Sequence, residues 1–250
     1  MNEKSHWNKI GDNYNNEIFD VFKSDTKKKL TLYFRKHANK KHSAIDFGCG
    51  NGKSFSYIAP LFKSIVAIDI SQALLNHAKD RPFTNIVFKQ KDLAKPNLKL
   101  ERVDFIFCCN VVMLPVIEKN KFMLKNLSNA LKPKGSAVLV LPALESVMFT
   151  SWRLIDWYTR EGVKPSEIDQ TEFDYFSGSK RDIIQGIIHI DKVPTKHYSA
   201  NELEVMFSDA GLKITSLDKV EYHWNTEFNE PPAWMKGPFP WDWLVECKKR

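Results

Sequence analysis

The chain has 250 residues, of which 43% are hydrophobic and 10 are glycine, a composition in the range of ordinary globular domains. This excludes intrinsically disordered and collagen-like proteins. The 37 lysine and arginine residues exceed the 30 aspartate and glutamate residues, but they form short, scattered clusters rather than one basic stripe. The longest nearly apolar run, residues 105–117, is shorter than the roughly 18 residues that a membrane span needs, so we expect a soluble protein with no membrane partner.

The N-terminus and the cysteines indicate the compartment. The first ten residues are polar and lack the apolar segment of a secretory signal, so we expect a cytoplasmic protein. The four cysteines form no C-x-x-C pair and have no histidine at a metal-binding spacing. We therefore expect reduced thiols and no metal site.

Residues 13–142 alternate helical and strand-like patterns. Residues 13–38 have an amphipathic pattern that predicts one or two helices, which we expect to lie across the carboxyl edge of a sheet. Ser71 is placed to cap a helix through Asp80, and residues 118–132 predict another helix that Pro133 and Gly135 end. Apolar runs rich in β-branched residues predict strands at 43–47, 64–69, 85–90, 104–109 and 136–141. This alternation predicts parallel βαβ units.

The rest of the chain, from residue 143 on, is less regular. Residues 143–197 are rich in aromatic side chains and show no strand–helix alternation, which indicates an insertion over one end of the sheet. Ser199 and Glu202 fit a capping box for a helix that Gly211 ends. Residues 212–220 and 241–248 predict an antiparallel hairpin at one edge of the sheet, joined by a segment rich in proline and tryptophan.

The strongest motif is the glycine-rich turn after the first strand, which runs from Asp46 to Ser54. Glycine at alternate positions allows positive φ and a close approach of the backbone to a ligand. A phosphate-binding P-loop would require glycine where Phe47 stands, so that interpretation fails by one residue. A dinucleotide fingerprint would require glycine at Lys53, which weakens it, although Asp69 has a spacing compatible with ribose recognition.

The pattern D-x-G-x-G-x-G fits this turn completely and resembles motif I of the class I S-adenosylmethionine-dependent methyltransferases. The Asp46 carboxylate would repel a diphosphate but attract the ammonium group of a methionine moiety. The resemblance implies a Rossmann-like α/β fold with a doubly wound sheet of seven strands, mostly parallel with an antiparallel last strand, and helices on both faces. It implies that the backbone of the turn contacts the cofactor at Gly48, Cys49, Gly50 and Gly52.

Further segments resemble the same family in the same order. Asp69 and Ile70 resemble the acidic end of the second strand, where the carboxylate binds both ribose hydroxyls. Asp92 and Leu93 resemble the segment that contacts adenine, and Asn110 falls where the family binds the methionine moiety and the ribose. The resemblance implies S-adenosylmethionine as cofactor and S-adenosylhomocysteine as product.

The catalytic residues are less defined. Tyr14 lies in a pattern similar to the N-terminal lid of small-molecule methyltransferases, where a tyrosine lies near the sulfonium methyl, but it could equally pack its helix on the sheet. We take Tyr14 as a candidate cofactor contact and catalytic residue, and His197 as a second catalytic candidate. The chain is then a single methyltransferase domain, 1–250, with a helical lid (1–42), a cofactor-binding core (43–142), an insertion over the acceptor site (143–197) and a C-terminal helix and hairpin (198–250).

We expect an enzyme that transfers a methyl group to a small-molecule acceptor by in-line displacement. Asn110 is not followed by the Pro-Pro-aromatic run of enzymes that methylate the amino groups of nucleic-acid bases, and no RNA-binding module is visible. The net charge of +7 keeps an RNA methyltransferase as an alternative. A regulatory or scaffold protein that binds the cofactor is another alternative, and an NAD-dependent oxidoreductase is a more distant one.

Overall fold

The structure is a computed structural model that describes Ser5, Trp7, Asn8 and residues 19–250. Tyr14 and most of the predicted lid lie outside these described residues. The main sheet has seven strands in the order β3-β2-β1-β4-β5-β9-β8. The strands are β1 (Asn39–Phe47), β2 (Phe62–Asp69), β3 (Ile86–Gln90), β4 (Val103–Cys109), β5 (Leu131–Pro142), β8 (Leu212–Glu221) and β9 (Trp241–Lys249).

The first five strands are parallel, and β9 runs antiparallel to both β5 and β8. The order reverses between β1 and β4, and in an open α/β sheet ligands bind at the carboxyl ends of the strands at such a switch point. The fold prediction is confirmed.

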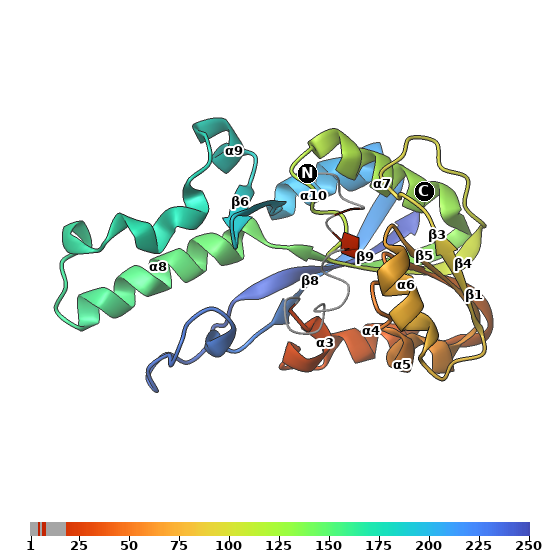
Figure 1. Ribbon diagram of the computed structural model, residues 1–250, viewed down its shortest axis with the longest axis horizontal. Helices are drawn as coiled ribbons and strands as arrows, with labels where there is room; N and C mark the ends of the chain where they lie inside the picture. Colours follow the sequence, from red (N-terminus) through yellow and green to blue (C-terminus); the bar gives the residue numbers. More distant parts are fainter. Residues whose placement is uncertain (1–4, 6, 9–18) are drawn as a thin grey trace.

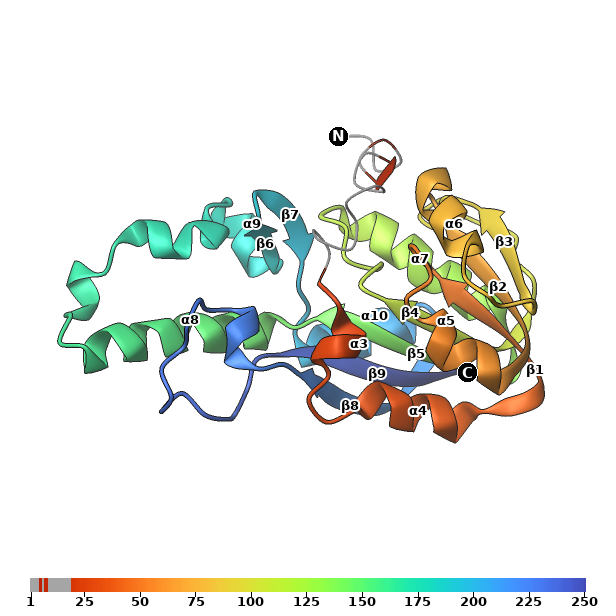
Figure 2. The ribbon, with the colours of Figure 1, turned by 60° about the horizontal axis from the view of Figure 1, so that its bottom comes forward.

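Helices cover both faces of the sheet (Figures 1 and 2). On β4, Phe105 and Phe107 pack toward one face, while Ile106 and Cys108 pack toward the other, as expected for a strand that is buried on both sides. The first face carries α4 (Lys29–His37), α5 (Phe55–Ile58) and α6 (Gln72–Lys79). The second carries α7 (Ile117–Ala130) and α10 (Ala200–Asp209), and the short helix α3 (Val21–Ser24) precedes α4.

The helix α4 lies on a face of the sheet rather than across its carboxyl edge, which corrects the prediction for the described part of residues 13–38. The Phe34 ring packs edge-on against Phe107, with 4.8 Å between ring centroids. The Lys29 ammonium lies 2.5 Å from Asp218 of β8, and His37 lies 2.7 Å from Glu246 of β9. The apolar stripe therefore holds α4 over the hydrophobic middle of the sheet.

The helix α7 ends two residues earlier than predicted. It stops at Ala130, and β5 begins at once with Leu131, which pairs with Val103. Lys132 cannot continue the helix because the following residue, Pro133, disfavours the helical conformation of the residue before it.

Residues 143–197, in which the sequence shows no strand–helix alternation, begin with a long helix that was not predicted. Residues Leu144–Arg160 form α8, the longest helix of the described chain, which projects from the carboxyl end of β5 (Figure 1). Two 3₁₀ helices (Pro165–Glu167 and Gln170–Phe176), α9 (Lys180–Ile184) and the hairpin of β6 (Ile187–Ile190) and β7 (Val193–Lys196) lead back to the sheet. The aromatic residues that obscured this helix in the sequence are its packing surface.

Their partners come from the segment rich in proline and tryptophan between β8 and β9. The ring of Phe149 lies 5.5 Å from Trp224, whose 3₁₀ helix is Trp224–Thr226, and Trp157 lies 5.8 Å from Phe228. The guanidinium of Arg160 lies 4.4 Å from the Trp234 ring. We call α8, residues 161–186 and the loop 222–240 the arm. The arm is thus built from two segments that are distant in sequence (Figures 1 and 2).

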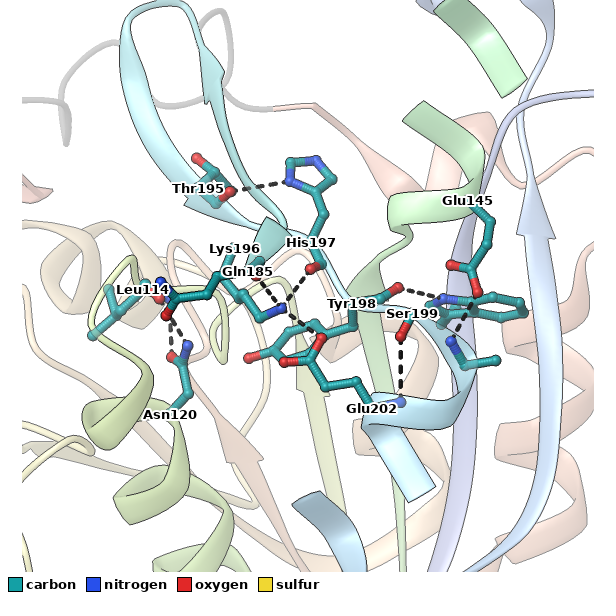
Figure 3. A network of polar contacts seen from close by, with 12 residues as sticks. Leu114, Asn120, Glu145, Gln185, Thr195, Lys196, His197, Tyr198, Ser199 and Glu202 are labelled. Atoms are coloured by element: carbon teal, nitrogen blue, oxygen red, sulfur yellow. Dashed lines mark hydrogen bonds and ion pairs between the residues drawn. The ribbon is translucent and has the colours of Figure 1, made fainter. Parts of the chain in front are cut away.

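A buried lysine, Lys196, connects the end of the arm to α10 (Figure 3). The side chain of Lys196 has no exposed surface, and its ammonium donates to Glu202 Oε2 (2.6 Å) and to the carbonyl oxygens of Gln185 (2.6 Å) and His197 (2.8 Å). Its three donors therefore meet three acceptors. Half of the predicted capping box forms: Ser199 accepts from the Glu202 N–H, while the Glu202 carboxylate pairs with Lys196 instead.

Replacing Lys196 with methionine should destabilise the fold by about 3 kcal/mol, because the buried carbonyls and the Glu202 carboxylate would lose their donor. Exposed Lys180, changed in the same way, should alter the free energy of unfolding by less than about 0.5 kcal/mol. Urea denaturation measures both. Equal stability of the two variants would contradict the role of Lys196.

Candidate active site

The glycine turn after β1 lies between the ends of β2 and β4. Gly48, Gly50 and Gly52 all have positive φ, of +83°, +52° and +78°. The N–H groups of Gly48 and Cys49 donate to the carbonyl of Ile68 at 2.8 and 2.9 Å. A Cβ atom on Gly48 would overlap the side chain of Val111, just after β4. Glycine here is therefore required both by conformation and by space.

Asp69 at the end of β2 is 8% exposed and holds the turn from the other side. Its Oδ2 accepts from the Gly50 N–H at 2.8 Å, and its Oδ1 accepts from the Ser71 N–H at 2.9 Å. Burial raises the pKa of Asp69, and these backbone hydrogen bonds oppose that rise. An ionised carboxylate accepts about four hydrogen bonds, so the carboxylate retains capacity for two more donors.

Asp46 lies in the interior beneath the turn. It is 2% exposed and accepts a hydrogen bond from Ser54 Oγ. Burial raises its pKa to about 7, and the charge of Asp69 adds to the rise. At neutral pH the free protein therefore carries a carboxyl group that is only partly ionised, and a nearby cation would stabilise its charged form.

The predicted adenine-binding segment lies next to Asp69. The Lys91 N–H donates to the Asp69 carbonyl at 2.9 Å. Asp92 is half-buried and accepts from the Ala94 N–H at 3.0 Å through Oδ1, whereas Leu93 is only 5% exposed. Asp92 can therefore reach a ligand with its carboxylate, and Leu93 can supply an apolar surface. Half-buried Ile70 directly follows Asp69.

Asn110, after β4, contacts residues that the sequence analysis missed. It has a φ of +52°, and its backbone N–H donates to the Val140 carbonyl at 3.0 Å. Its Nδ2 lies 3.5 Å from Asp242 Oδ2, and the Tyr222 hydroxyl donates to the same oxygen at 2.8 Å. Burial raises the pKa of Asp242 to about 7. The sequence offered one signal, an acidic residue flanked by Trp241 and Trp243 at the start of the last strand.

His197 directly follows Lys196, the last residue of β7. It is 6% exposed, and its Nδ1 lies 3.1 Å from the Thr195 carbonyl, which means that Nδ1 carries the proton. Burial lowers its pKa to about 4, so the ring is neutral at pH 7. In Figure 3 the ring and the Lys196 ammonium lie on opposite sides of the chain. His197 therefore stays a candidate, and Tyr14 lies outside the described residues.

Other site types find no support in the part of the chain that the structure describes. Within it, no group of three or more histidine, cysteine, aspartate or glutamate side chains could hold a metal ion. No described helix is both long and apolar enough to cross a bilayer. The four cysteines are free thiols.

Comparison with known proteins shows which family the cofactor-binding core resembles. Residues 44–135 match the family model described as "Methyltransferase domain". "Putative methyltransferase 235L" of Invertebrate iridescent virus 6 is 34% identical over 106 residues, which are 41% of this chain and 37% of that protein. The chain therefore matches little more than a third of that relative's length.

Two solved structures show the same fold over nearly the whole chain. The N-methyltransferase NodS of Bradyrhizobium japonicum, in complex with S-adenosylhomocysteine, has a TM-score of 0.60 at 11% identity, covering 100% of this chain and 99% of NodS. A methyltransferase of Haloferax volcanii, in complex with the Trm112 activator, has a TM-score of 0.63 at 15% identity, covering 100% and 98%.

Residues 44–135 are therefore a methyltransferase domain, and the fold around them is shared with solved S-adenosylmethionine-dependent methyltransferases. The methyltransferase resemblance of the glycine turn is confirmed for this core. The methyltransferase core places Gly48, Gly50, Asp69, Asp92 and Asn110 at the carboxyl edge of β1 to β4, as the motif spacing predicted.

Changing Asp46 to asparagine should stabilise the methyltransferase at pH 8. Because the folded pKa of about 7 exceeds the ordinary value of 3.8, the native state binds more protons between these values, and stability falls as the pH rises through this range. Asparagine does not titrate. The free energy of unfolding of the variant, relative to that of the wild type, should therefore be at least about 1 kcal/mol higher at pH 8 than at pH 5. Thermal unfolding at both pH values measures this. A variant with the same pH dependence as the wild type would contradict the raised pKa.

Proposed function

We propose that this protein transfers the methyl group of S-adenosylmethionine to a small-molecule acceptor at the carboxyl edge of the sheet. The observation that carries the proposal is the Asp69 carboxylate, which holds Gly50 and Ser71 through one hydrogen bond each and retains capacity for two hydroxyl donors. The two hydroxyl groups of the cofactor's ribose match that capacity.

The surrounding residues fit the rest of the cofactor. Asp92 would accept from the adenine amino group while Leu93 packs on the ring, and the turn from Gly48 to Gly52, with Cys49 as a backbone contact, would approach the methionine moiety. Asp46 would favour its ammonium group through its charge. Asn110 would contact the same moiety from the end of β4.

When bound, S-adenosylmethionine supplies a methyl carbon activated by a positively charged sulfur. The residues of this chain would bind and orient the reactants, since positioning alone can contribute about 7 to 11 kcal/mol to a barrier. The arm begins at the carboxyl end of β5 and returns before β9, so it borders the region that the acceptor must enter. We propose that residues 143–197 and the loop 222–240 form the acceptor side of the site.

An RNA acceptor is the second candidate, because the chain carries a net charge of +7. A small molecule is favoured because the short basic clusters along the chain give no continuous path for a phosphate backbone.

Asp69→Ala should weaken S-adenosylhomocysteine binding by roughly 1 to 3 kcal/mol, the scale for losing hydrogen bonds to a charged group. Calorimetry measures this change. The matched control is Asp80→Ala, because Asp80 is exposed at the end of α6 and should leave the affinity unchanged. If the two variants bind equally well, Asp69 does not hold the cofactor.

The acceptor class is tested by measuring the formation of S-adenosylhomocysteine with a low-molecular-weight metabolite fraction and, separately, with purified tRNA. We expect turnover with metabolites and only weak, salt-sensitive binding of tRNA. Turnover restricted to tRNA, with tight binding that falls steeply with salt, would favour the RNA candidate.

A further inference from the structure

The carboxylate of Asp242 accepts hydrogen bonds through only one of its two oxygens among the described residues. Its Oδ2 accepts from the Tyr222 hydroxyl (2.8 Å) and from Asn110 Nδ2 (3.5 Å). Among the described residues, no donor is paired with Oδ1. Asp242 is half-buried, and its Oδ1 atom is not fully buried. The side chain is therefore fixed in orientation, while one oxygen remains open to a ligand.

The position of Asp242 follows from strand pairing. It pairs with Pro142, the last residue of β5, and with Val220 near the end of β8. It thus lies at the carboxyl edge of the sheet, one side chain away from Asn110, which we assign to the methionine end of the cofactor. Val111, the next residue, closes against Gly48 of the glycine turn. Asp242 therefore stands beside the end of the cofactor that carries the reactive methyl group.

Acidic groups surround Asp242. Burial raises the pKa of Asp242, the charge of Glu227 from the arm raises it further, and the charges of Asp242 and Asp20 both act on the Cys109 thiol of β4. Asp20 is paired with Lys53 at 3.4 Å, whereas Asp242 takes part in no ion pair among the described residues. Tyr222, just after β8, and Asn110, just after β4, are the donors that face it. Although the chain as a whole is basic, this part of the carboxyl edge favours a cation.

We propose that the acceptor is an amine, and that Oδ1 of Asp242 binds its ammonium form and takes its proton. This rests on the proposed function. Once the proton passes to Oδ1, the nitrogen lone pair forms a bond to the methyl carbon while the carbon–sulfur bond breaks, and that bond's electron pair stays on sulfur as S-adenosylhomocysteine. The proton later leaves Asp242 to solvent, which its remaining exposure permits.

The proposal can be tested without knowing the amine. Sinefungin carries an amine-bearing carbon in place of the methylated sulfur, so its ammonium group reports on the position of the transferred methyl. S-adenosylhomocysteine lacks that charge. The ratio of the two affinities, measured by calorimetry from pH 6 to pH 8.5, should favour sinefungin increasingly as Asp242 ionises, with a midpoint near its pKa of about 7.

Asp242→Asn should abolish this pH dependence and reduce the sinefungin preference at pH 8 by about 10- to 100-fold, while S-adenosylhomocysteine still binds and thereby shows that the variant is folded. Tyr222→Phe should move the midpoint to higher pH, because the hydroxyl stabilises the ionised carboxylate. The control is Asp209→Asn, since Asp209 is exposed on α10 and its change should leave the ratio and midpoint as in the wild type.

The outcomes separate the two claims. A flat ratio in the wild type, or an unchanged ratio in Asp242→Asn, with both ligands still bound, would overturn the role of Asp242 and leave the proposed function standing. If the wild type binds neither ligand, the proposed function fails and the inference fails with it.

Discussion

The site depends on the attachment of the glycine turn to the end of β2. Two backbone donors of the turn bond to the Ile68 carbonyl, and the Gly50 N–H bonds to the Asp69 carboxylate. These contacts fix the positive-φ backbone beside the point between β1 and β4 where the order of the parallel strands reverses. The same carboxylate positions the turn in the free protein and keeps capacity to accept further hydrogen bonds.

The second constraint is the attachment of the arm. The long helix α8 has little sheet to pack on, and its aromatic face is covered by the loop before β9. The Lys196 ammonium then ties the end of the arm to α10 and to the chain around β7. This arrangement gives the carboxyl edge a fixed border. The pairing of β9 with β5 and β8 places Asp242, at the start of β9, and Tyr222, just after β8, next to Asn110 after the end of β4.

The features that could be predicted from the sequence are those that depend on residues close together in the chain. The strands, the Ser71 cap of α6 and the ligand-facing turn follow from hydrophobic spacing and glycine placement, and Asp69 could be singled out because strand ends meet at one edge of a parallel sheet. The helix α8 was not predicted because its aromatic residues pack against a loop that lies 71 to 75 residues later in the sequence, as Trp157 does on Phe228 and Phe149 on Trp224, so the local pattern did not show what they cover. Asp242 escaped for a similar reason, since its hydrogen bonds to Tyr222 and Asn110 exist only after β9 inserts between β5 and β8.

The central claim is that the Asp69 carboxylate binds the ribose hydroxyls of the cofactor while it stays bonded to the glycine turn. A crystal structure of the complex with S-adenosylhomocysteine tests this claim most directly. The account predicts both ribose hydroxyls within hydrogen-bond distance of the Asp69 carboxylate, with the Gly50 and Ser71 N–H groups still bonded to it. Ligand density elsewhere on the protein, or an Asp69 carboxylate without ligand atoms around it, would contradict the account.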